Sequence, residues 1–171
     1  MPNKWTFQIK PIKKLLGKYV GDGKGWIDPF AGESSPAEFT NDLNPERKSK
    51  YHLPAIEFIK QLNGNKFNGV LFDPPYSARQ VKECYENIGL KMSYEDTLNG
   101  MFHLEKNNIA PKIKAGGLSL SFGWNTNGLG RNRGFEIVEI LLVAHGGHHN
   151  DTIVTVERKV NTSLDAFNTS A

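Results

Sequence analysis

The sequence predicts an α/β fold in which a mostly parallel central sheet ends in an antiparallel hairpin. Short apolar runs typical of buried strands alternate along the chain with stretches whose apolar residues follow the helical period. The last two apolar runs, 135–144 and 152–160, are joined by a loop, 145–151, that is too short to hold a crossover helix. Alternating strands and helices followed by such a pair indicate a parallel sheet with one reversed strand.

Length and composition predict one globular domain. The chain has 171 residues and a mass of 19.1 kDa, with 38% hydrophobic and 23% charged residues. We expect 1–160 to form this domain and 161–171 to be a polar tail. A single cysteine, Cys84, excludes an intramolecular disulfide and a Cys-rich zinc site. No apolar run approaches the roughly 18 residues of a membrane span, and no signal peptide is evident, so we expect a cytoplasmic protein.

The charge balance permits a polyanionic partner without indicating one. The 21 Lys and Arg residues against 18 Asp and Glu residues give a net charge of +3, with a pI of about 8.9. Many enzymes that act on small substrates carry as much positive charge, so the functional argument depends on motifs.

The first part of the chain predicts one helix and three short strands. Apolar residues recur at helical spacing from Ile9 to Tyr19, and Pro11 is compatible with a first helical turn. The glycine-rich segment 21–25 ends that helix. Strands are expected at 26–30 and 39–42, and a very short one at 51–53.

The middle of the chain predicts a helix at 55–62, a strand at 67–72, further helices, and a strand at 118–124. Two helical faces are expected on the basis of apolar spacing: the first holds Val81, Cys84, Tyr85 and Ile88, and the second holds Leu98, Met101, Phe102 and Ile109. On this basis Cys84 is expected to lie in the core.

Asp73, Pro74, Pro75 and Tyr76 directly follow the strand predicted at 67–72. Two successive prolines fix φ twice and remove two N–H donors, which leaves carbonyl acceptors that no local donor uses. The Asp73 carboxylate and the Pro74 carbonyl then form two acceptors below the aromatic face of Tyr76. Such a site suits a planar heterocycle with an exocyclic amine, because accepting both amine hydrogens makes its lone pair available for attack. The alternative is an ordinary strand-ending turn capped by Asp73.

The segment 28–34 is the second motif, an acidic strand end followed by a turn that contains Gly32. Gly32 lets the backbone approach a ligand, and Asp42, after the next strand, can accept hydrogen bonds from two ribose hydroxyls. A single glycine stands where a dinucleotide fingerprint needs several, so a ligand with a ribose and no pyrophosphate fits better. Asp28 is expected to face a cationic or amine-bearing part of that ligand. The alternative is a plain strand–turn–helix connection.

Together the two motifs resemble those of the S-adenosylmethionine-dependent amino-methyltransferases of the Asp-Pro-Pro-Tyr type, which methylate the adenine amine in DNA. The resemblance covers about 7–160, and the segments 121–125 and 145–151 look like a phage and prokaryotic branch of adenine-specific methylases. It implies a Rossmann-like methyltransferase fold, S-adenosylmethionine as cofactor, and DNA as substrate and partner. With no separate target-recognition domain, we expect little built-in sequence specificity, or a partner subunit or homodimer that supplies it.

The resemblance also assigns roles to individual residues. Asp73, Pro74, Pro75 and Tyr76 match the catalytic motif. The cofactor-binding residues that it implies are Lys10, Pro11, Asp28, Pro29, Phe30, Ala31, Gly32, Asp42, Leu53 and Ala55. Two positions depart from the family pattern: Ser34 replaces a second glycine, and Pro54 replaces the acid that holds the cofactor's adenine amine. Contact with that adenine would then fall to the Ala55 backbone or to Leu53.

On the substrate side we expect contacts from Arg79, Gln80, Phe122, Trp124, Asn125, Arg131, Arg133 and His149. The loop 125–133 carries two arginines and no apolar anchor, which favours a mobile flap that contacts phosphates. One of Phe122 and Trp124 is expected to pack in the core and the other to line the base pocket. The histidines of 145–149 lack a cysteine or fixed carboxylate partner, so we expect a polar rim there and no metal site.

The same residues also fit two other classes of function. The same corner could present another amine, such as cytosine N4, adenine in RNA or a protein side-chain amide. The chain could also be a weakly active subunit that binds the cofactor or DNA within a two-chain methylase. A target base inside a duplex would have to be flipped out, whereas single-stranded substrate avoids that cost.

Overall fold

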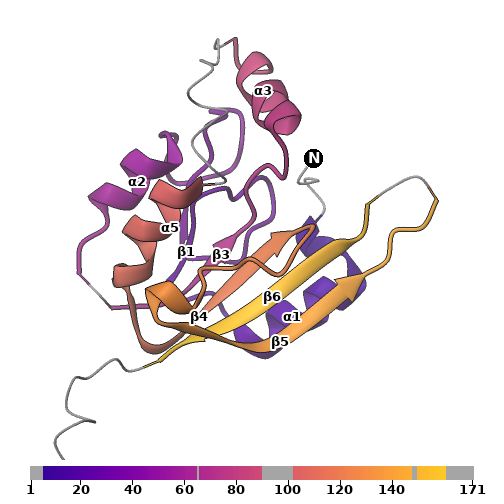
Figure 1. Cartoon of the computed structure of the whole chain (residues 1–171). Coiled ribbons are helices and arrows are strands. Elements are labelled where there is room, and N and C mark those ends of the chain that lie inside the picture. The colour runs from indigo at the N-terminus through magenta and orange to yellow at the C-terminus, as the bar shows by residue number, and fades with distance from the viewer. Residues whose placement is uncertain (1–5, 65, 90–101, 148–149, 161–171) are drawn as a thin grey trace, which may run out of the picture.

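The computed structural model describes residues 6–64, 66–89, 102–147 and 150–160 (Figure 1). The helices and strands are, in chain order, η1 (Thr6–Gln8), α1 (Lys10–Tyr19), β1 (Trp26–Asp28), β2 (Phe39–Thr40), α2 (Ala55–Gln61), β3 (Phe67–Phe72), α3 (Ala78–Glu86), α5 (His103–Ile109), η3 (Ala110–Lys112), β4 (Ile113–Gly123), η4 (Arg131–Arg133), β5 (Phe135–Val143) and β6 (Thr152–Lys159). No helix within these ranges is both long enough and apolar enough to span a membrane.

The strands form one six-stranded sheet in the order β2-β1-β3-β4-β6-β5. Strands β1, β2, β3 and β4 pair in parallel, and β6 runs antiparallel to both β4 and β5. The predicted α/β class, with a mostly parallel sheet and a terminal antiparallel hairpin, is therefore confirmed. Because the first four strands run the same way, their carboxyl ends lie at one edge of the sheet.

Helices cover the two faces of the sheet (Figure 1). On one face, Ile12, Leu15 and Leu16 of α1 pack in a cluster with Leu71 of β3 and Leu120 of β4. The opposite face carries a second cluster to which α2 and α5 contribute, with Phe58, Ile59 and Ile109 among its members. Successive side chains of β3 point to opposite faces, so this strand belongs to both clusters.

Several strands differ from their predicted extents: β1 and β2 each end two residues before their predicted ends at 30 and 42. The strand expected at 51–53 is reduced to a single parallel bridge between Tyr51 and Asn41, and β4 begins at Ile113, before the expected 118. Its first residue pairs with Phe67 of β3, and the register then shifts before Gly69 pairs with Leu118. This irregularity falls within a glycine-containing stretch, which explains why the first part of β4 lacked a strand pattern.

The prediction that Cys84 packs in the core is wrong. Helix α3 extends away from the sheet in Figure 1, so its apolar side chains have no opposing sheet surface. Cys84, Val81 and Tyr85 are half-buried and line a cavity. Of the second predicted helical face, Leu98 and Met101 lie outside the described residues, as does the tail expected at 161–171.

Candidate functional site

A cavity of about 1200 Å³ opens along the carboxyl ends of β1, β3 and β4. It brings together the two motifs that lie far apart in the sequence. From the first motif and its flanking strands it is lined by Pro29, Phe30, Ala31, Gly32, Asp42, Leu53 and Ala55, and from the second by Asp73, Pro74, Pro75 and Tyr76. Phe122, Trp124, Asn125, Arg131 and Arg133 complete the predicted residues on its wall.

Asp28 does not line this cavity, so the expectation that it faces a ligand is not met. Its side chain is fully buried inside the turn, where Oδ1 accepts the Phe30 N–H at 3.0 Å and Oδ2 accepts the Ser35 hydroxyl at 2.6 Å. Burial raises the pKa of Asp28 to about 8, although both hydrogen bonds act to lower it. Asp28 therefore shapes the turn from within.

Asp42 presents its carboxylate at the cavity wall beside the glycine turn. Its Oδ2 accepts the Gly32 N–H at 3.0 Å, and its Oδ1 accepts the Asn44 N–H at 2.8 Å. Gly32 has a φ of +57°, a left-handed conformation that favours glycine. Each carboxylate oxygen retains acceptor capacity, so Asp42 can still bind hydroxyl donors from a ligand.

Asn41 is a positioning residue that the sequence pattern did not single out. It is 1% exposed, and its Nδ2 donates to the Pro29 carbonyl at 3.1 Å and to the Leu53 carbonyl at 3.0 Å. Its Oδ1 accepts the Leu53 N–H at 3.0 Å. One buried amide thus fixes two backbone segments, at Pro29 and at Leu53, around the end of the cavity that holds the glycine turn. This explains why Leu53 lies there although the predicted third strand is hardly formed.

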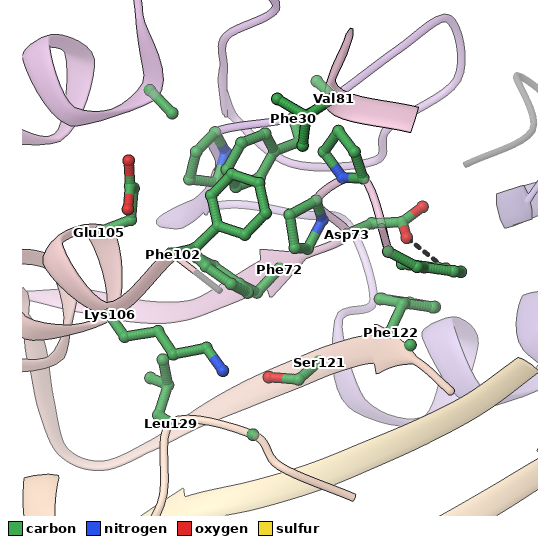
Figure 2. Close-up of a pocket in the computed structure, with 18 of the residues that line it drawn as sticks. Phe30, Phe72, Asp73, Val81, Phe102, Glu105, Lys106, Ser121, Phe122 and Leu129 are labelled. Atoms are coloured by element: carbon green, nitrogen blue, oxygen red, sulfur yellow. Dashed lines mark hydrogen bonds between the residues drawn. The ribbon is translucent and has the colours of Figure 1, made fainter. Parts of the chain in front are cut away.

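Asp73 directly follows the carboxyl end of β3, where it is 3% exposed. The Tyr76 hydroxyl donates to its Oδ1 at 2.6 Å, the contact drawn as a dashed line in Figure 2, and the Thr6 side chain also hydrogen-bonds to it. Burial raises the pKa of Asp73 to about 7, while these two hydrogen bonds act to lower it. Burial and the neighbouring carboxylate also raise the pKa of Tyr76, so the phenol stays protonated and acts as a donor.

Gln80 and Arg79 lie away from the cavity wall, contrary to their predicted substrate contacts. Gln80 is buried, and its Oε1 accepts the Tyr76 N–H at 2.6 Å, while Ser77 caps α3 by accepting the Gln80 N–H. Gln80 therefore holds the loop that carries Tyr76. Arg79 is exposed and its Nε pairs with Glu83 Oε1 at 2.8 Å, along the surface of the same helix.

Aromatic side chains form two walls of the cavity. Phe30, Phe72 and Phe102 meet edge to face, with ring centroids 5.4 Å apart for the first two and 5.2 Å apart for Phe30 and Phe102. Nearer Asp73, the Trp124 ring packs edge to face on the Tyr76 ring, with ring centroids 5.7 Å apart, and Trp124 is 42% exposed. Phe122 is 5% exposed and belongs to the α1 cluster, so one of the predicted pair packs in the core as expected.

The predicted mobile flap at 125–133 has an apolar anchor, so the prediction that it lacks one is wrong. Leu129 is fully buried, and its N–H donates to Glu157 Oε2 at 2.6 Å while the Gly130 N–H donates to Oε1 at 2.9 Å. Glu157 is a buried carboxylate on β6 that sequence analysis missed. A Cβ at Gly128 would lie 2.0 Å from its Oε2, so any larger residue there would have to displace the carboxylate.

The two arginines of this loop differ in their surroundings. Arg133 donates to Leu129 O, to Asn107 Oδ1 at 2.7 Å, and to Asn132 Oδ1, and its Nη2 lies 3.0 Å from His103 Nδ1. Its guanidinium thus holds the loop, whereas Arg131 is exposed at the cavity rim. The difference arises because α5, which carries His103 and Asn107, lies beside Arg133 in the folded protein. The sequence alone does not show this contact.

Two further predicted residues, both on α1, do not line the cavity. Lys10 and Pro11 are exposed in the first turn of α1 and do not line it, whereas Thr6 and Phe7 just before them do. His149 lies outside the described residues. Within 6–64, 66–89, 102–147 and 150–160, no group of three or more His, Cys, Asp or Glu residues is arranged to hold a metal ion.

Comparison with known proteins shows similarity at the level of the fold. No protein-family model matches the sequence, and no curated protein sequence matches it. The structure is similar to that of 1,6-didemethyltoxoflavin-N1-methyltransferase from Burkholderia thailandensis, solved with bound 1,6-didemethyltoxoflavin and S-adenosylhomocysteine. The two chains are 13% identical, with a TM-score of 0.57 over 89% of this chain and 78% of that chain.

Two further solved structures share the fold. The proposed methyltransferase yhhF from Escherichia coli is 10% identical, with a TM-score of 0.53 over 90% of this chain and 87% of that chain. The proposed methylase HI0767 from Haemophilus influenzae is 12% identical, with a TM-score of 0.50 over 88% and 87% of the two chains. The protein therefore has the Rossmann-like fold of these methyltransferases.

Proposed function

We propose that this protein is an S-adenosylmethionine-dependent methyltransferase that acts on the exocyclic amine of adenine in DNA. The observation that supports this proposal best is that one cavity joins the glycine turn and Asp42 to the Asp73 corner. A donor and an acceptor of a methyl group must lie side by side in such a site. A structural turn at either motif would need no shared cavity.

The residues of the first motif fit the nucleoside part of S-adenosylmethionine. Asp42 offers carboxylate lone pairs for two ribose hydroxyls, and the turn at Gly32 brings backbone close to the ligand. Leu53, Ala55 and Ile56 give this end an apolar wall suited to an adenine ring. When bound, S-adenosylmethionine would supply a sulfonium methyl group, whose carbon the amine lone pair would attack while S-adenosylhomocysteine leaves.

The residues of the second motif orient the amine and polarise its N–H bonds. In its ionised form Asp73 accepts one amine hydrogen, and the Pro74 carbonyl is the second acceptor. With a pKa of about 7, Asp73 is partly ionised at neutral pH and can accept the proton that the amine loses after transfer. Tyr76 and Trp124 provide aromatic faces for the base, worth about 1–3 kcal/mol per base in single-strand binders.

A free nitrogen heterocycle is a second candidate substrate. The fold neighbour from Burkholderia thailandensis was solved with 1,6-didemethyltoxoflavin, and the aromatic walls of this cavity suit any planar ring of similar size. Cytosine in DNA, adenine in RNA and a protein amide would present their amines to Asp73 in the same way. The family resemblance of the Asp-Pro-Pro-Tyr motif favours adenine in DNA over these alternatives.

The edge strand β5 supports the prediction of a partner. Ile137, Val138, Ile140 and Leu142 are each between 44% and 61% exposed on this strand, whose single partner among the described strands is β6. Exposed apolar side chains on an open edge favour association. We propose that a second copy of the chain or a recognition subunit covers this edge, and sedimentation velocity of the purified chain distinguishes a homodimer from a monomer that needs another partner.

Replacement of Asp42 tests the cofactor end of this proposal. We expect Asp42→Ala to weaken S-adenosylmethionine binding by more than about 1 kcal/mol, because charge-assisted hydrogen bonds to the ribose are lost. Isothermal titration calorimetry of the wild-type and variant proteins measures the difference. Glu46→Ala, an exposed charge change in the following turn, is the matched control. Equal affinity for wild type and Asp42→Ala would place the nucleoside elsewhere.

A tritiated-methyl assay on DNA, RNA, protein and free heterocycles tests the acceptor end. The proposal predicts label in DNA, with single-stranded DNA at least as good as duplex because no base has to be flipped. Label only in a free heterocycle would favour the second candidate, and label only in RNA or protein would select another amine. Cofactor binding without any transfer would indicate a subunit that needs its partner.

A further inference from the structure

One part of the cavity, which we call the chamber, is lined by Phe72, Phe102, Lys106, Ser121 and Leu129 (Figure 2). Lys106 reaches it from α5 and Ser121 from β4, and Figure 2 shows both polar groups directed into the same space. The sequence motifs had assigned no role to either side chain. The other side chains of the chamber are apolar, so this cation and this hydroxyl are its two candidates for polar contact with a ligand.

Lys106 is held in place and keeps donor capacity. Its Nζ donates to the Asn127 carbonyl at 3.0 Å and lies 5.7 Å from the centroid of the Phe72 ring. Among the described residues this is its one hydrogen bond, while an ammonium has three N–H donors. Burial and the nearby Arg133 lower the pKa of Lys106, against the opposing effect of Glu157. A partly desolvated donor of this kind binds a neutral acceptor at a smaller cost than a fully hydrated one.

The chamber has a polar floor next to this donor. Ser121 is 6% exposed, its Oγ lies 3.2 Å from Ser119 Oγ, and it pairs in register with Thr155 of β6. The Thr155 hydroxyl is fully buried and has no hydrogen-bond partner among the described residues. Ser121 therefore presents a polar group on the cavity wall beside Lys106, whereas Thr155 lies behind that wall and does not line the cavity.

Donors and acceptors are separated across the chamber. Phe72 pairs in register with Ser121 of β4, and Asp73 follows Phe72 in the chain. Figure 2 shows the Asp73 carboxylate on one side of the Phe72 ring and the polar groups of Lys106 and Ser121 on the other. Adenine has the complementary order, because its amine donates while ring nitrogens beside it accept. A base with a carbonyl in place of the amine and an N–H beside it has the reverse order.

We propose that Lys106 reads the target base by donating a hydrogen bond to one of its ring nitrogens, with Ser121 as the second polar contact. This inference rests on the proposed function, since it places the reacting amine at Asp73. It makes Lys106 a specificity-determining residue that selects amino-bearing bases and rejects carbonyl-bearing ones, in which an N–H would face the ammonium.

The test measures binding, so that it does not depend on turnover. A fluorescent single-stranded oligonucleotide with one adenine is compared with three analogues in which that base is 1-deaza-, 3-deaza- or 7-deazaadenine, each titrated in the presence of S-adenosylhomocysteine. Each analogue removes one ring nitrogen and keeps the amine. Wild type should bind one of the three about 10-fold or more weakly than adenine, as expected for a hydrogen bond to a charged donor.

Variants assign that loss to Lys106. Lys106→Met keeps the aliphatic stem and should bind adenine and the discriminated analogue equally, both at the weaker affinity. Lys60→Met removes the same charge from an exposed position on α2 and should discriminate as wild type does. Ser121→Ala should lower adenine affinity less than Lys106→Met does.

Three outcomes separate this inference from the proposed function. Equal binding of all four bases by wild type, or discrimination that persists in Lys106→Met, overturns the role of Lys106. Methyl transfer to adenine with no dependence on Lys106 overturns the inference and leaves the proposed function intact. Lys106-dependent discrimination by a protein that transfers no methyl group to adenine supports the base-reading role and contradicts the proposed reaction.

Discussion

Asp28 and Asp73 are both buried at strand ends, yet their contacts give them different roles. Asp28 accepts hydrogen bonds within its own turn, whereas Asp73 lines the cavity and meets a tyrosine hydroxyl from the proline corner. Burial raises the pKa of each, to about 8 and about 7. The carboxylate that a ligand can reach is therefore Asp73.

The Tyr76 hydroxyl tunes the ionisation of Asp73, and its removal should change the pH profile. The hydrogen bond from Tyr76 stabilises the Asp73 carboxylate and so lowers its pKa against the effect of burial. In Tyr76→Phe the pKa of Asp73 should rise above about 7, because the aromatic ring stays and the donor is lost. The acidic limb of kcat/KM should move to higher pH by a measurable fraction of a unit. An unchanged limb would mean that the activity does not depend on Asp73 ionisation.

Asp28 predicts a pH dependence of stability. The pKa of Asp28 in the folded state, about 8, lies above the ordinary aspartate value of 3.8, so between these values the folded protein holds a proton that the unfolded chain releases. The free energy of unfolding should therefore fall as pH rises through this window and level off above pH 8. Asn in place of Asp28 removes the titrating group and can keep the contacts to Phe30 and Ser35.

Urea unfolding of wild type and Asp28→Asn at about pH 5 and about pH 9 measures this effect. The free energy of unfolding of the variant minus that of wild type should be larger at about pH 9 than at about pH 5. We expect this increase to be at least about 1 kcal/mol. Asp22→Asn, at an exposed position in the turn after α1, is the control and should show no such difference. If the difference between Asp28→Asn and wild type did not change with pH, folding would not raise the pKa of Asp28, and the prediction would be wrong.

At the scale of elements, the loop 125–133 owes its position to β6. The Glu157 carboxylate accepts two backbone N–H groups of the loop, and Leu129 inserts into the cluster that also holds Phe72 and Phe135. The loop composition, which is rich in Gly, Asn and Arg, is typical of a flexible connection. The contact that fixes it comes from a strand more than twenty residues later, so only the three-dimensional structure could reveal it.

Removal of Glu157 should therefore destabilise the protein through this loop. Glu157→Ala leaves the N–H groups of Leu129 and Gly130 without their acceptor, which should cost about 2–6 kcal/mol at about 1–3 kcal/mol for each donor. Chemical denaturation measures the loss, and limited proteolysis should show faster cleavage within 125–130. Arg131→Ala, in the same loop but exposed, should change stability by less than about 0.5 kcal/mol. Equal stability of Glu157→Ala and wild type would contradict the anchoring.

Local patterns in the sequence predicted the elements that carry their own signal. The apolar run of β3, the proline corner after it and the hairpin of β5 and β6 are visible in consecutive residues, and the structure confirms these elements. Asn41, Lys106 and Glu157 have no such signal, because their roles depend on partners distant in the chain. Cys84 was misplaced for the same reason: helical periodicity shows which side chains share a face, but not what that face meets.

For the whole molecule, the order of the strands creates the site. Strands β1 and β3 are neighbours in the sheet although a strand and a helix separate them in sequence, so the segments that follow them open into one cavity. The sequence predicted this arrangement because consecutive parallel strands share a carboxyl edge. It could not predict the chamber, whose walls come from α5, β4 and the loop before β5.

The most direct test of the whole account is mass spectrometry of nucleosides digested from DNA and RNA after incubation with the protein and S-adenosylmethionine carrying a deuterated methyl group. Wild type should yield labelled N6-methyladenosine from DNA, as the deoxynucleoside. Asp73→Ala should yield at least about 100-fold less while its cofactor affinity stays within a few-fold of wild type. Undiminished product from Asp73→Ala would contradict the proposed role of Asp73. If wild type binds the cofactor and the nucleic acids but yields no labelled base, the proposed reaction is wrong.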